Sequence, residues 1–227
     1  AWTPREILTL DLSGSETVFT ENDIDSALVI RQDDQVVIRL SIIEIVQPQR
    51  IRVRANRTVP QPLRNVPVGN WSWARSTFAG LDEFEGRTLS VVVDGEVAVK
   101  TVTDGRIGPF DVPATFVQAG LPFVSDMETL DISDSRQSIL DKTKLIRRVT
   151  LLAESSRGVW AGPDFRRLTE SKQREDEFYD SHVRQRTGFF DVHIDARWSR
   201  NGRVCVRQRD PLPLTVLGIM PDVLVGS

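Results

Sequence analysis

Carboxylates gather at one point of the chain, where Asp82, Glu83 and Glu85 stand within four residues of one another. Two carboxyl groups at a suitable separation can hydrolyse a glycoside, one as general acid and the other as base or nucleophile. These residues come directly before an expected strand, and acidic side chains are common in turns and at helix caps. The sequence therefore favours a turn here over a catalytic pair.

A second candidate is His193, which stands between Asp191 and Asp195 in an alternating segment. Alternation places the three side chains on one face of a strand, where they could bind a metal ion together. A solvated sheet face has the same pattern and is the favoured interpretation. Cys205 is the only cysteine, and the alternating residues around it indicate a packed thiol.

No Gly-x-Ser-x-Gly motif and no phosphate-binding loop occurs in the sequence. We therefore expect no catalytic residue, no cofactor and no metal site, which points to a part of an assembly and away from an enzyme. The aromatic residues leave an alternative open. Trp71, Trp73 and Trp160 could stack on sugar rings, as in a carbohydrate- or receptor-binding β module. Trp71 and Trp73 lie at the end of a proline-rich linker, which favours packing of the junction between the modules.

Charge and hydropathy exclude two classes of protein. The net charge of the 227 residues is −3, which argues against a protein that grips duplex DNA through its phosphates. Of the 29 basic residues, 25 are arginine, which suits partly desolvated contacts between subunits better than lysine does. The longest apolar runs, such as residues 214–220, are far too short to span a bilayer.

Short alternating segments bounded by turn residues run through most of the chain and predict an all-β fold of two sandwich-like or barrel-like modules with little helix. In residues 50–55 arginines alternate with apolar residues, which is typical of a half-buried strand. Pro60, Pro62 and Pro67 then interrupt regular structure. We expect an N-terminal module over residues 1–57, a linker over 58–78 and a C-terminal domain over 79–227.

Turn dipeptides and alternation also predict strand pairs. Asp94-Gly95 indicates a tight hairpin between residues 88–93 and 97–102. We expect a second hairpin between residues 189–196 and 202–208. We expect the C-terminal strand block to be structural, with four mostly buried side chains, those of Leu212, Leu214, Val216 and Leu217.

Residues 164–186 are rich in charges of both signs, which cancel within the segment. A long balanced loop between two strands is costly to order unless something holds it. We expect it to dock on a neighbouring subunit, with aromatic anchors and arginines at the rim. The candidate interface residues are Phe178, Tyr179, Arg184 and Arg186.

Three blocks of sequence, taken in order, resemble the tail nozzle proteins of short-tailed bacteriophages, the tail tubular protein B family. The first is Leu81-Asp-Glu-Phe-Glu-Gly followed by a strand and Asp94-Gly95, and the second is Ala119-Gly-Leu-Pro-Phe-Val-Ser-Asp-Met-Glu-Thr-Leu-Asp131. The third is Asp210-Pro-Leu-Pro-Leu-Thr-Val-Leu217. Phe84 and Glu85 depart from the commoner His-Leu. Family members are several times longer, with a platform where residues 70–78 stand here.

The resemblance implies a structural protein of the virion that forms a ring, expected to be a hexamer, at the end of the tail. It implies contacts with the tail adaptor and other tail proteins, and an axial hole through which genomic DNA passes during ejection. Such a lumen must not grip phosphates, and a net charge of −3 is compatible with that.

Overall fold

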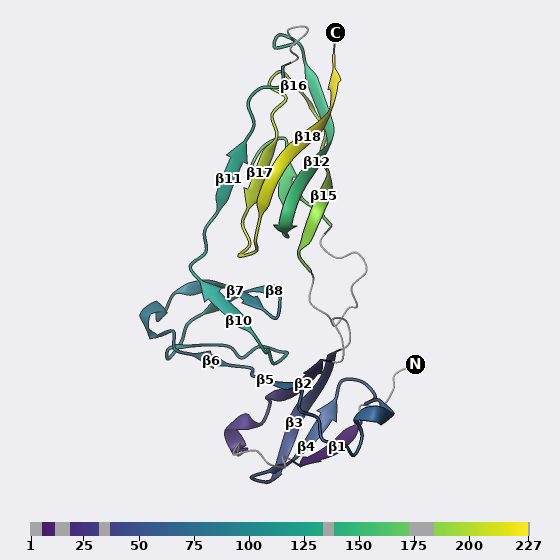
Figure 1. The fold of residues 1–227 in the computed structure, drawn as a ribbon. Coiled ribbons are helices and arrows are strands. Elements are labelled where there is room, and N and C mark those ends of the chain that lie inside the picture. Colours follow the sequence, from purple (N-terminus) through teal and green to yellow (C-terminus); the bar gives the residue numbers. More distant parts are fainter. Residues whose placement is uncertain (1–5, 12–18, 32–36, 134–138, 173–183, 227) are drawn as a thin grey trace. The chain divides into compact units, whose positions relative to one another are not determined.

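The structure is a computed structural model that describes residues 6–11, 19–31, 37–133, 139–172 and 184–226. Strands dominate the described residues, and the helices among them are three single 3-10 turns, so the predicted all-β class is confirmed. The chain forms two compact units, one made by Ala1–Ala119 and one that begins at Gly120 (Figure 1). None of the helices among the described residues is long and apolar enough to cross a membrane.

The first unit contains an antiparallel five-stranded sheet in the order β1-β4-β3-β2-β5. In β4 the arginines are exposed and Ile51, Val53 and Ala55 are buried, so the predicted two faces of this strand are confirmed. Phe19 and Val59, which lie outside the strands, pack in the same core. The strands and the 3-10 turn before β2 are β1 (Ile7–Asp11), η1 (Glu21–Asp23), β2 (Ala27–Arg31), β3 (Val37–Gln47), β4 (Arg50–Ala55) and β5 (Trp71–Ala74).

The segment expected as a linker lies within the first unit. It holds the 3-10 turn η2 (Gln61–Leu63) and then β5, which pairs with β2 in the sheet. Among the described strands, none runs through Pro60, Pro62 or Pro67. A division into folding modules at residues 58–78 stays a prediction, while the compact units part after Ala119.

The rest of the first unit contains a smaller sheet in the order β10-β7-β8 and a separate two-stranded sheet, β6-β9. The predicted hairpin is present, because Asp94 and Gly95 have φ angles of 45° and 89° and join β7 to β8. Leu89, Val91, Val102, Ile107 and Phe110 form its core. The elements are β6 (Phe78–Ala79), η3 (Asp82–Phe84), β7 (Thr88–Val93), β8 (Glu96–Thr101), β9 (Arg106–Ile107) and β10 (Val117–Gly120).

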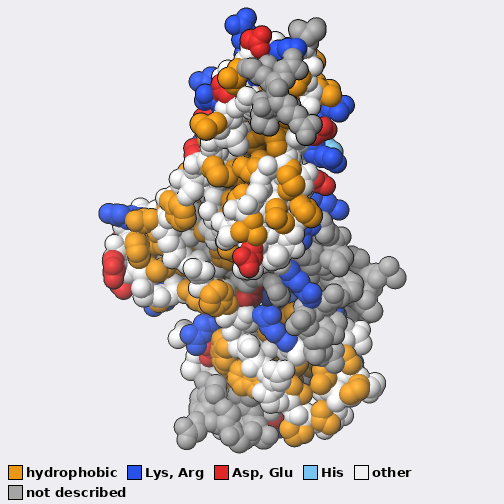
Figure 2. Space-filling view, turned by 45° about the horizontal axis from the view of Figure 1, so that its top comes forward, with side chains coloured by type: hydrophobic (Ala, Val, Ile, Leu, Met, Phe, Trp, Pro, Cys, Tyr) orange, Lys and Arg blue, Asp and Glu red, His pale blue; other side chains and the backbone are white. Residues whose placement is uncertain are grey.

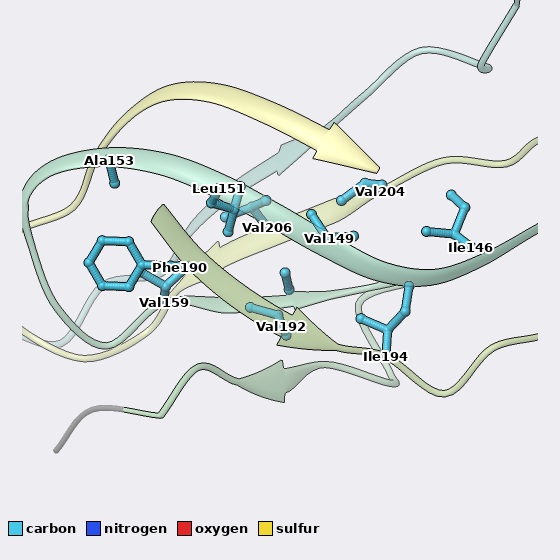
Figure 3. Close-up of a cluster of buried hydrophobic side chains, with 11 residues drawn as sticks. Ile146, Val149, Leu151, Ala153, Val159, Phe190, Val192, Ile194, Val204 and Val206 are labelled. Atoms are coloured by element: carbon cyan, nitrogen blue, oxygen red, sulfur yellow. The ribbon is translucent and has the colours of Figure 1, made fainter. Parts of the chain in front are cut away.

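The second unit is a β-sandwich. One sheet has the order β11-β17-β13-β14, and in the other β12 pairs with β15 and β16 and also with β18. Figure 3 shows side chains of both sheets meeting in one core, with Leu151 and Val149 of β12 close to Val204 and Val206. The strands are β11 (Ser125–Glu128), β12 (Lys144–Ser156), β13 (Trp160–Gly162), β14 (Thr169–Glu170), β15 (Arg186–His193), β16 (Trp198–Ser199), β17 (Cys205–Gln208) and β18 (Thr215–Val225).

Two expectations for this unit are wrong. The segments 189–196 and 202–208 do not form a hairpin, because β15 pairs with β12 while β17 pairs with β11 and β13 in the opposite sheet. Leu212 is buried as expected, but Leu217 is 59% exposed. The register shifts where Gly218 faces Leu152 and Val216 faces Ala153, so Leu217 is the extra residue of a bulge and points outward.

Candidate subunit interface

The acidic cluster at Asp82, Glu83 and Glu85 shapes a turn. The carboxylate of Glu85 accepts hydrogen bonds from the backbone N–H of Asp104 at 3.1 Å and of Gly105 at 2.8 Å. The carboxylate of Asp82 lies where a side chain at residue 105 would stand, which explains the glycine there. The turn interpretation is therefore confirmed for Glu85.

The row Asp191, His193 and Asp195 lies on the exposed side of β15 and of the residues after it. Asp191 accepts a hydrogen bond from the hydroxyl of Thr150, and Asp195 forms an ion pair with Arg197 at 3.4 Å. In the part of the chain that the structure describes, no three His, Cys, Asp or Glu side chains are grouped as they would be around a metal ion.

Cys205 is a buried thiol, as predicted. Burial raises its pKa from 9.0 to about 11, and nearby carboxylates add to the shift. Because the thiolate is the reactive form, a pKa two units higher leaves about 100-fold less thiolate at any pH well below 9.

We expect iodoacetamide at pH 8 to alkylate the folded protein at least about 100-fold more slowly than the protein unfolded in guanidinium chloride. Raising the pH toward 11 should speed up the reaction of the folded protein more than that of the unfolded one. Mass spectrometry of the Cys205 adduct measures both rates. Similar rates for folded and unfolded protein at pH 8 would contradict the burial of this thiol.

Other side chains pack against the rings of the tryptophans that were considered as sugar platforms. The Trp73 ring stacks on Phe19 with a centroid separation of 5.4 Å, and Trp71 lies 6.4 Å from Trp73. The guanidinium of Arg209 covers one face of the Trp160 ring at 3.6 Å. Trp71 and Trp73 pack against the core of the five-stranded sheet, while their role at a junction between modules and carbohydrate binding stay predictions.

The second unit begins with an extended stretch, residues 121–130, whose large apolar side chains are turned to solvent. Leu130 is 87% exposed and Phe123 is 61% exposed. Soluble monomers rarely leave so many large apolar residues uncovered in one place. The exposed apolar residues of this 121–130 segment are Leu121, Phe123, Val124, Met127 and Leu130.

Ion pairs hold the 121–130 segment against β17. Arg207 donates two hydrogen bonds of 2.7 Å to Asp126, and Arg203 contacts Glu128 at 3.3 Å and also Asp131. The hydrogen bonds from Arg207 lower the pKa of Asp126, so the pair stays ionised at neutral pH. The segment is thus held through Asp126 and Glu128, while its large apolar side chains face solvent.

A second apolar surface lies on the outer face of the sheet formed by β12, β15, β16 and β18. Alternation along β12 turns Ile146, Val149 and Leu151 to the core and Leu145 and Leu152 outward. Figure 2 shows hydrophobic side chains gathered on the part of the second unit where these strands lie. The exposed apolar residues of this outer face are Phe189, Trp198, Leu217, Met220 and Leu224.

Two of the four interface residues predicted from the charged loop lie among the described residues. Phe178 and Tyr179 lie outside the described residues. Arg184 is exposed, and the guanidinium of Arg186 lies 4.4 Å from the centre of the Phe190 ring. The docking role of this loop stays a prediction.

The sequence offered a weak signal for the 121–130 segment. Its apolar residues do not alternate strictly and Pro122 interrupts them, so the pattern fits neither a half-buried strand nor a core strand. Known protein families and curated proteins were both compared with the sequence, and neither comparison found a match.

Proposed function

We propose that this protein is a structural, non-enzymatic subunit of a phage virion: a tail nozzle protein that forms a ring, expected to be a hexamer, at the end of a short tail. Its partners would be further copies of itself, the tail adaptor and other tail proteins. Genomic DNA would pass through the ring without sequence-specific contacts.

The observation that carries this proposal is the exposure of the 121–130 segment. The segment coincides with the second block of the resemblance, residues 119–131. A packed core would explain an apolar block in a sequence, but these side chains take no part in the described cores. Burial against another protein is a physical reason for ordered apolar side chains at these positions.

The charge of the chain supports the lumen that the proposal requires. Each phosphate that a protein neutralises adds a salt-dependent attraction, which would slow the passage of DNA. The net charge is −3, and many arginines are already bound to carboxylates, as in the pairs Arg50–Asp11 and Arg52–Glu44.

Mass photometry of the purified protein tests the proposal. We expect a discrete species whose mass is a fixed multiple of 25.6 kDa, six copies for the expected hexamer. A protein that stays at the mass of one copy at every concentration measured, including when mixed with the tail adaptor, would contradict a ring-forming role.

A further inference from the structure

We propose that the subunits join head to tail: the 121–130 segment of one copy docks on the outer face of β12, β15, β16 and β18 of the next copy. This inference rests on the proposed ring-forming function and names the two surfaces that would make the contact.

The two surfaces lie on different sheets of one compact unit. The 121–130 segment runs beside β17 through its strand β11, while the outer face belongs to the opposite sheet of the sandwich. One copy can therefore offer its segment to one neighbour and its outer face to another at the same time. A contact between two different patches, repeated by rotation, forms a ring where the rotation closes and an open filament where it does not.

The apolar areas of the two surfaces suit a stable contact. The exposed fractions add up to about three fully exposed side chains on the segment and about two and a half on the outer face, or roughly 450 and 400 Å² at about 150 Å² each. Because interfaces are about 60% apolar, mutual burial of this area corresponds to a total of roughly 1,400 Å². Stable interfaces bury about 1,200–2,000 Å².

A symmetric contact between two copies of the same surface would cover the apolar side chains of the segment and the outer face less completely. If two outer faces packed on each other, Phe123, Leu130 and their neighbours would stay in water. If two segments packed on each other, Phe189, Leu217 and Trp198 would stay in water instead. Only the contact between segment and outer face covers both surfaces with one kind of interface.

Pairing through the free edge of β18 is less favourable than use of its face. In the described part of the chain, β18 pairs with β12 alone, and Pro221 stands opposite Val149 in that ladder. Proline has no N–H, so it is tolerated where its nitrogen faces away from the neighbouring strand. The free edge therefore lacks a donor at Pro221, a feature that discourages further strand pairing.

Two variants, tested alone and mixed, distinguish these arrangements. The segment variant carries Phe123→Asp and Leu130→Asp, and the face variant carries Phe189→Asp and Leu217→Asp. All four side chains are more than half exposed, so both variants should keep the unfolding temperature of the parent. Val99→Asp is the matched control, because Val99 is 65% exposed on β8 of the first unit.

We expect each variant alone to stay monomeric in mass photometry, with self-association weakened at least about 30-fold, while Val99→Asp assembles like the parent. Mixed together, the two variants should form a one-to-one dimer that grows no further. In that dimer the intact segment of the face variant occupies the intact face of the segment variant. A second pair, Met127→Lys and Met220→Lys, repeats the test if one of the first variants loses its unfolding transition.

The other outcomes overturn the inference in distinguishable ways. If only one variant fails to assemble and the mixture forms no new dimer, the contact is symmetric. If both variants assemble like the parent, other surfaces join the subunits, and the proposed ring function is unaffected. If the parent itself never assembles, the proposed function fails.

Discussion

Replacing Leu151 with alanine should lower the free energy of unfolding of the second unit by about 2–5 kcal/mol. The side chain is fully buried between the two sheets, where it packs with residues such as Val206 (Figure 3). Alanine would leave a cavity that the surrounding strands can fill only in part, because β12 is fixed by β15 on one side and by β18 on the other. Urea unfolding of the parent and the variant measures the difference.

Leu140→Ala is the matched control for this substitution. Leu140 belongs to the same unit but is 53% exposed, so its truncation removes little buried surface and should cost less than about 1 kcal/mol. Equal losses of stability for the two variants would mean that Leu151 is not at the centre of the sandwich core.

Replacing Asp94 with alanine should cost the first unit about 2–4 kcal/mol. The Asp94 carboxylate accepts hydrogen bonds from the N–H of Thr115 at 3.0 Å, from its hydroxyl at 2.6 Å and from the N–H of Phe116 at 2.9 Å. It also lies 3.6 Å from the guanidinium of Arg39 in the five-stranded sheet. Loss of the carboxylate would leave these partly buried donors without their acceptor.

The control for this variant is Asp104→Ala. Asp104 also begins an Asp-Gly turn, with a φ of 52° against 45° at Asp94, so alanine meets the same backbone strain at both positions. No side-chain hydrogen bond of Asp104 is found in the described residues, so the difference between the two variants isolates the effect of the Asp94 carboxylate. Thermal unfolding that is shifted equally by both substitutions would contradict this role.

Local features of the fold could be predicted from the sequence because they depend on neighbouring residues. Asp94-Gly95 predicted its hairpin since both residues tolerate a positive φ. The 3-10 turn η1 is likewise local, because the N–H and the hydroxyl of Thr20 both bond to the Asp23 carboxylate. Alternation in residues 50–55 predicted which side chains of β4 would be buried.

Pairing partners and bulges could not be predicted in the same way. Alternation gives the face of a strand but not its neighbour, so β15 and β17 were expected to pair although they lie in opposite sheets. Leu217 points outward because of the bulge opposite Leu152 and Ala153. That bulge depends on how β18 pairs with β12. Both errors concern contacts between residues that are far apart in sequence.

The candidate interface was hidden from the sequence for a related reason. An apolar side chain looks the same in a sequence whether it fills a core or faces solvent. Leu130 and Leu151 differ only in the strands that surround them, yet one is 87% exposed and the other is fully buried. The structure was needed to separate the apolar residues that hold the fold from those left for a partner.

Electron microscopy of the purified protein tests the ring-forming role most directly. We expect class averages to show closed rings with an axial opening and rotational symmetry, sixfold for the expected hexamer. Particles of one or two copies, or open chains with no axial opening at any concentration, would contradict the proposal that this protein conducts DNA as a nozzle subunit.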